Sequence, residues 1–144
     1  MTAIEIRAID HVVLRVRDRE RALRFYCDVL HCKEERRLES LGLTQLRAGA
    51  SLIDLVEVDA PLGRLGGEPP GEGARNVDHF ALDLASFDEA AIREHLVRHG
   101  VAPGEVGMRY GARGTGPSMY VRDPDGNIVE LKGPAVSPGS SDLE

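Results

Sequence analysis

The sequence predicts an α+β fold made of two β-α-β-β-β modules, and three observations support this prediction. The segments IDHVVLRV (residues 9–16) and VDHFALDL (residues 77–84) are similar. Each is followed by a polar break and a helical pattern, and each half ends in an apolar–acid–Leu strand. A Gly- and Pro-rich stretch separates the halves. Such self-similarity in 144 residues indicates a duplicated supersecondary unit.

In the first half, we expect one helix and three further strands after the opening strand. Residues 19–30 carry apolar side chains at a 3.6-residue period, and Asp18 is a suitable N-cap for this helix. Strand-like patterns follow at residues 33–40, 43–47 and 52–58.

The second half repeats the order of the first. A helix is expected over residues 87–99, because Ser86 and Glu89 have the spacing of a capping box. Gly100 suits the left-handed residue that ends a helix. Strand-like patterns follow at residues 101–109, 118–122 and 127–132.

Glycine and proline mark the connections. The stretch at residues 59–74 cannot form a helix or a central strand, so it is interpreted as a linker. The DPDGN sequence at residues 123–127 predicts a tight hairpin turn, and residues 110–116 are expected to form a mobile connection, a possible lid. The expected organisation is one domain (1–144) with modules at 6–58 and 75–133 and a flexible tail at 134–144.

Composition excludes several classes of function. With 18 Lys and Arg against 24 Asp and Glu, the net charge is −6, and the basic residues are dispersed, so no nucleic-acid partner is expected. No apolar run is long enough to span a membrane, and the N-terminus lacks a secretory signal, which predicts a cytoplasmic protein. Cys27 and Cys32 are expected to be reduced structural thiols.

Strand alternation gathers polar side chains on one face of each half. His11 and His79 are expected to point away from the face that carries the helix, and Asp54 and Glu130 should lie on the same side as the histidines. Two imidazoles and two carboxylates can bind a divalent metal such as Zn, Fe, Mn or Ni. A structural role for each of the four stays open from the residues alone.

Three segments carry a resemblance to a known family: IDHVVLRVRDRERALRFYCDVL, VDHFALDL and SMYVRDPDGNIVEL. They resemble the vicinal oxygen chelate superfamily, which includes glyoxalase I, fosfomycin-resistance enzymes, extradiol dioxygenases and bleomycin-resistance proteins. The resemblance covers residues 9–132 and implies paired βαβββ modules, each a half-barrel around a cavity. It also implies a homodimer, with intrachain and exchanged module pairing both open.

The resemblance implies that one divalent metal ion (Zn, Ni, Mn or Fe) is bound by His11, His79 and Glu130. Asp54 is the fourth candidate ligand, where glyoxalase I-like members carry Glu. Catalytic roles are implied for Glu130, Asp54 and Tyr120. Substrate contacts are expected from Arg15, Arg113, Ser118 and Arg122.

The function implied is that of a lactoylglutathione lyase-like lyase or isomerase. Its metal chelates a small substrate with vicinal oxygens and stabilises an enediolate-type intermediate, while Glu130 or Asp54 moves a proton. Arg15 matches an anion-binding Arg of glutathione-using members, but Val58 replaces their Asn, so glutathione stays one option for a co-substrate. Two alternatives stay open: a metal-free binder of the bleomycin-resistance type, and an extradiol-type dioxygenase using Tyr120.

Overall fold

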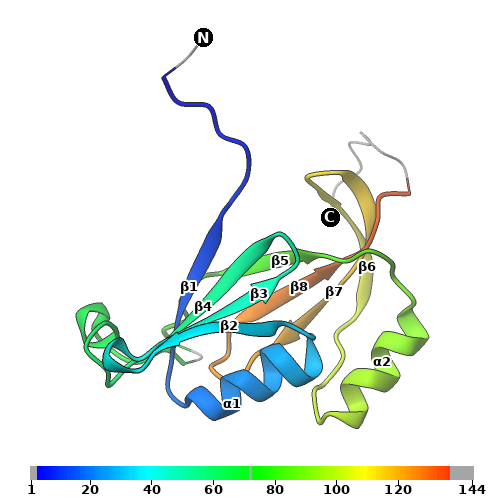
Figure 1. The fold of residues 1–144 in the computed structure, drawn as a ribbon. Helices are drawn as coiled ribbons and strands as arrows, with labels where there is room; N and C mark the ends of the chain where they lie inside the picture. The colour runs from blue at the N-terminus through cyan, green and yellow to red at the C-terminus, as the bar shows by residue number, and fades with distance from the viewer. Residues whose placement is uncertain (1–2, 72, 137–144) are drawn as a thin grey trace. The chain divides into compact units, whose positions relative to one another are not determined.

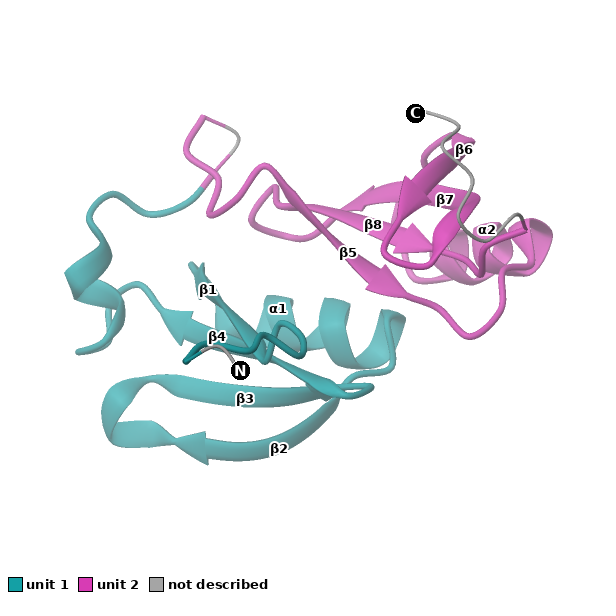
Figure 2. Ribbon diagram, turned by 90° about the horizontal axis from the view of Figure 1, so that it is seen from above, with its two compact units in different colours: residues 1–70 teal, residues 71–144 magenta. Residues whose placement is uncertain are grey.

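The computed structural model describes residues 3–71 and 73–136. The chain divides into two compact units, Met1–Pro70 and Gly71–Glu144, shown in teal and magenta in Figure 2. Among the described residues, each unit contains one four-stranded sheet and one main helix (Figure 1).

Unit 1 has the element order β-α-β-β-β, with short helical segments between. Its elements are β1 (His11–Val16), α1 (Arg19–Leu23), η1 (Arg24–Val29), β2 (Lys33–Leu38), η2 (Glu39–Leu41), β3 (Leu43–Ala48), β4 (Ser51–Glu57) and η3 (Gly63–Gly66). The strand order is β1-β4-β3-β2, with β1 parallel to β4 and the other pairs antiparallel.

Unit 2 repeats this topology. Its elements are β5 (His79–Asp83), α2 (Glu89–Arg98), β6 (Val106–Gly111), β7 (Gly114–Arg122) and β8 (Ile128–Lys132). The strand order is β5-β8-β7-β6, again with one parallel pair, β5 and β8, and two antiparallel pairs. The predicted α+β class and the duplicated module are therefore confirmed.

The first helix changes its winding halfway. Asp18 caps α1 as predicted, because its Oδ1 accepts a hydrogen bond from the backbone N–H of Arg21 at 3.2 Å. The chain then continues as the π-helical η1, and the N–H of Leu30 donates to the carbonyl of Phe25, five residues back, at 3.0 Å. The buried side chains of this helix form the expected stripe: Ala22, Phe25, Tyr26 and Val29.

The start of α2 differs from the prediction. Asp88, and not Ser86, is the N-cap, because its Oδ1 accepts from the N–H of Ala91 at 3.1 Å. Asp88 lies directly before the first helical turn, where its short carboxylate reaches an unpaired N–H of that turn. Gly100 has φ 75°, so the left-handed helix end is confirmed.

The connection at residues 110–116 is a β-hairpin and not the expected mobile loop. Strands β6 and β7 pair up to Gly111 and Gly114, leaving a two-residue turn between them. Glycine is required at position 116 of β7, because the carbonyl oxygen of Pro134 occupies the space where a Cβ would project. Strand β6 begins only at Val106, so the expectation of a strand from residue 101 is wrong for its first five residues.

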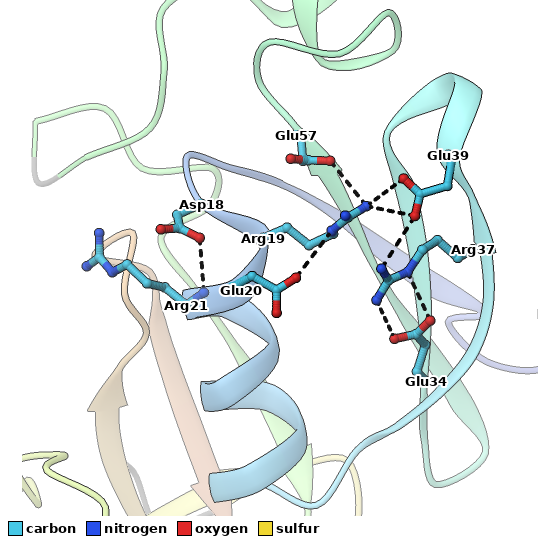
Figure 3. A network of polar contacts seen from close by, with 8 residues as sticks. All are labelled: Asp18, Arg19, Glu20, Arg21, Glu34, Arg37, Glu39 and Glu57. Carbon is cyan, nitrogen blue, oxygen red and sulfur yellow. Dashed lines mark hydrogen bonds and ion pairs between the residues drawn. The ribbon is translucent and has the colours of Figure 1, made fainter.

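Salt bridges cover the polar edge strand β2 and the start of α1 (Figure 3). Arg37 donates to both carboxylate oxygens of Glu34, at 2.7 and 3.0 Å. Arg37 and Arg19 both contact Glu39, and Arg19 also contacts Glu57. Charged side chains on an edge strand discourage pairing with a foreign strand.

The predicted tail falls largely outside the description, because residues 137–144 are not among the described residues. Just before them, the N–H of Val136 donates to the carbonyl of Thr115 at 2.8 Å. Within the described ranges, no helix is long and apolar enough to cross a membrane.

Candidate functional site

In unit 1, the parallel pairing of β1 with β4 places His11 and Asp54 on one face. His11 lies opposite Leu52, and Asp54 lies opposite Val13, two residues further along both strands. Asp54 is buried, with 4% exposure. The hydrogen bond with Asp10 raises the pKa of His11, and the negative charge of Asp54 adds to this rise.

Unit 2 repeats this geometry with the same offset. His79 lies opposite Ile128, and Glu130 lies opposite Ala81. The Nε2 of His79 is 3.4 Å from the Oε1 of Glu130, whose side chain is 6% exposed. Each unit therefore brings its own predicted histidine and carboxylate together, while their role as metal ligands stays a prediction.

The two carboxylates have equivalent neighbours on the next strand. Gln45 on β3 lies opposite Asp54, and Tyr120 on β7 lies opposite Glu130. The Nε2 of Gln45 donates to the Oδ2 of Asp54 at 3.0 Å. The other oxygen of Asp54, Oδ1, is buried with no hydrogen-bond partner among the described residues. Sequence reasoning missed Gln45, which the β3–β4 register reveals.

Tyr120 belongs to a group of contacts next to the unit 2 pair. Its ring meets the His79 ring edge to face, with 5.5 Å between centroids. The guanidinium of Arg109 lies over the Tyr120 ring at 4.4 Å. Arg109 also donates to the carbonyl and to the Oγ of Ser118, at 2.9 and 2.8 Å. Arg109 was missed from sequence because its neighbours are on the other strand of the hairpin.

The three arginines that the sequence predicts to bind substrate lie in different settings. Arg15 donates through its guanidinium to four backbone carbonyls of the linker, those of Gly63, Gly66, Gly67 and Glu68. Arg113, in the β6–β7 turn, forms an ion pair with Asp83 at 3.4 Å. Arg122 is exposed at the end of β7. Their contacts with a substrate stay predictions.

The donor atoms in each unit suit a divalent metal, one imidazole nitrogen with one carboxylate. Nothing in residues 3–71 and 73–136 groups three or more His, Cys, Asp or Glu side chains in a way that could hold a metal ion. The buried Oδ1 of Asp54 is nevertheless the kind of atom that a cation satisfies, because a buried carboxylate oxygen needs a donor or a cation.

Comparison with known proteins identifies relatives over most of the chain. The sequence model described as the Glyoxalase/Bleomycin resistance protein/Dioxygenase superfamily matches residues 8–131. Catechol-2,3-dioxygenase from Bacillus subtilis (strain 168) is 29% identical over 133 residues, 91% of this chain and 43% of the dioxygenase. A glyoxalase domain-containing protein from Mycosarcoma maydis is 26% identical and covers 89% of this chain and 69% of its own length. This chain thus spans less than half of the dioxygenase.

Solved structures show the same fold. A virulence protein from Salmonella typhimurium is 27% identical with a TM-score of 0.69, covering 92% of this chain and 100% of its own. An integron cassette protein from V. cholerae is 30% identical with a TM-score of 0.68, covering 92% and 98%. Lactoylglutathione lyase from Agrobacterium tumefaciens is 21% identical with a TM-score of 0.60, covering 88% and 92%, a similarity of fold alone.

Proposed function

Because the chain belongs to the Glyoxalase/Bleomycin resistance protein/Dioxygenase superfamily, we propose that it is a metal-dependent enzyme acting on a small molecule with two adjacent oxygen atoms. The observation that carries the proposal is the buried Oδ1 of Asp54, which has no hydrogen-bond partner among the described residues. Burying a carboxylate oxygen without a donor or cation is unfavourable, and a metal ion at Oδ1 would offset this cost.

The proposed ligands are the two pairs, His11 with Asp54 and His79 with Glu130. The 3.4 Å between the Nε2 of His79 and Glu130 supports this set, because either a proton or a metal ion between these atoms stabilises the pair. Four such ligands leave open positions for substrate oxygens on Zn, Ni, Mn or Fe. When bound, the metal supplies Lewis acidity toward those oxygens.

The side chains then have distinct tasks. Glu130 is buried beside His79, so as a carboxylate it can take a proton from a substrate carbon and return it to the neighbouring carbon. Asp54 is held through one oxygen by Gln45, which leaves the other oxygen for the metal or the proton. Tyr120 packs against the His79 ring, and its hydroxyl can donate a hydrogen bond to a substrate oxygen.

Two reaction types fit these residues. A lyase or isomerase of the lactoylglutathione lyase kind uses the carboxylate as the proton carrier, with glutathione as one option for the co-substrate. A ring-cleaving dioxygenase is the second candidate, favoured by the 29% identity to catechol-2,3-dioxygenase and by Tyr120 beside His79. We further propose that the protein acts as a homodimer.

The test is an assay of metal-free protein loaded in turn with Zn²⁺, Ni²⁺, Mn²⁺ or Fe²⁺. Turnover is measured with the hemithioacetal of methylglyoxal and glutathione, and with catechol and oxygen. Activity with one substrate that is lost in Glu130→Ala supports the matching reaction. Absence of metal uptake together with tight binding of an organic ligand would instead support a sequestering protein of the bleomycin-resistance type.

A further inference from the structure

Both units place an aspartate directly before the histidine and in contact with its ring. The Nδ1 of His11 is 2.7 Å from the Oδ1 of Asp10, and the Nδ1 of His79 is 2.8 Å from the Oδ2 of Asp78. The two contacts arise in separate sheets from the same short Asp-His sequence. This repetition means that the ring orientation is specified twice, independently, in one chain.

We propose that Asp10 and Asp78 are positioning residues, which hold His11 and His79 in the tautomer that presents Nε2 to the metal. This inference rests on the proposed function, since it assigns a role to residues outside the ligand set. Neither aspartate is proposed to touch the metal or the substrate.

The chemistry of the contact determines the tautomer. An ionised carboxylate only accepts hydrogen bonds, so the Nδ1 of each ring must be the donor. A neutral imidazole that carries its proton on Nδ1 has its lone pair on Nε2, which is the form that binds a metal. In unit 2, Nε2 is the nitrogen that faces the Oε1 of Glu130, at 3.4 Å.

The resulting order, Asp78–His79–Glu130, places one carboxylate at each nitrogen of the ring. The outer carboxylate fixes the orientation of the ring, as outer-shell partners of metal-binding histidines do. The guanidinium of Arg75 forms an ion pair with the other oxygen of Asp78, at 3.8 Å.

The aspartates are well suited to substitution because they do not support the cores. Their side chains are 90% exposed for Asp10 and 83% exposed for Asp78. Removing either one therefore leaves the packing of its unit intact. Loss of such an outer partner typically lowers metal affinity about 10- to 100-fold.

The first measurement is a calorimetric titration of metal-free protein with Zn²⁺ in the presence of a competing chelator. Asp10→Ala and Asp78→Ala are each expected to weaken binding about 10- to 100-fold. Asp10→Asn and Asp78→Asn should retain most of the affinity, because the amide oxygen still accepts from Nδ1. Asp28→Ala, which removes an exposed carboxylate on η1, controls for the change in net charge. Equal weakening in Asp28→Ala and Asp78→Ala would overturn the proposal.

The second measurement needs no metal. Nitrogen NMR shifts of the histidine rings, recorded well above the imidazole pKa and assigned with His11→Ala and His79→Ala, report which nitrogen carries the proton. The wild type should show Nδ1 protonated on both rings, for His79 because the Oδ2 of Asp78, at 2.8 Å from Nδ1, is closer than the Oε1 of Glu130, at 3.4 Å from Nε2. Each Asp→Ala variant should shift its own ring toward Nε2 protonation. An unchanged tautomer would refute the positioning role. A protein that binds no metal but shows the shift would refute the proposed function alone.

Discussion

The contacts of Arg15 with the linker predict how much stability this side chain contributes. Its guanidinium donates to the carbonyls of Gly63, Gly66, Gly67 and Glu68, at 3.1, 3.0, 2.8 and 2.9 Å. The linker packs closely against this side chain, since a Cβ added at Gly66 would clash with the Arg15 guanidinium. Arg15 therefore ties the Gly- and Pro-rich segment to β1.

The expected cost of Arg15→Ala is the sum of four modest contributions. A hydrogen bond contributes about 0.5–1.5 kcal/mol net, and three of these four are exposed, so the lower end applies to them. The total is about 2 kcal/mol in the free energy of unfolding. For a chain of this size that is a fall of about 4–8 °C in Tm.

Urea denaturation gives the free energy of unfolding, and hydrogen exchange of residues 63–68 reports the linker itself. Arg15→Ala should lose stability and should also speed exchange in the linker. Arg15→Lys keeps the charge but cannot reach four carbonyls, so it should behave nearly like Arg15→Ala. Arg24→Ala, at an exposed site on η1, is the control. Equal stability and equal linker exchange in Arg15→Ala and Arg24→Ala would refute this role of Arg15.

Asp123→Ala should lower the free energy of unfolding of unit 2 by about 2–4 kcal/mol, measured by thermal unfolding. The buried carboxylate of Asp123 accepts three hydrogen bonds in the β7–β8 turn, and the three donors would lose their acceptor. An unchanged Tm would contradict this expectation. Burial raises the pKa of the Cys32 thiol to about 11, so alkylation of Cys32 at neutral pH should be about a hundredfold slower than that of an unburied thiol. The alkylation rate should rise with pH up to about pH 11, and fast labelling at neutral pH would contradict the burial of this thiol. The hydrogen bond from Arg47 lowers the pKa of Glu35 below 4.5, so this pair stabilises the fold above that pH, and the stabilisation is lost as the pH falls through the lowered pKa. Arg47→Ala should therefore reduce the loss of stability at acid pH, measured by unfolding at a series of pH values. An identical pH profile in Arg47→Ala and the wild type would exclude this contribution.

Much of the fold was predictable because the two halves of the sequence repeat the same pattern of apolar and polar residues. The alternation in 9–16 and 77–84 predicted which side chains share a face, and the register of each parallel pair places the histidine and carboxylate two residues apart. The family resemblance drawn from these segments is confirmed by the match over residues 8–131.

The parts that sequence could not predict depend on the packing of distant segments. The glycines between Tyr110 and Pro117 resemble a loop, yet this segment pairs as a hairpin, and Gly116 leaves room there for the backbone of Pro134. Arg109 and Gln45 acquire their roles from cross-strand neighbours. The sequence shows that Asp10 precedes His11, but only side-chain geometry shows the contact with Nδ1.

The most direct test of the central claim is the number of metal ions that the protein binds. One divalent ion per chain is expected, measured by elemental analysis and by titration of the metal-free protein. Binding should be lost in both His11→Ala and His79→Ala, because both histidines are proposed ligands. No uptake of Zn²⁺, Ni²⁺, Mn²⁺ or Fe²⁺, or two ions per chain lost independently in the two variants, would contradict it.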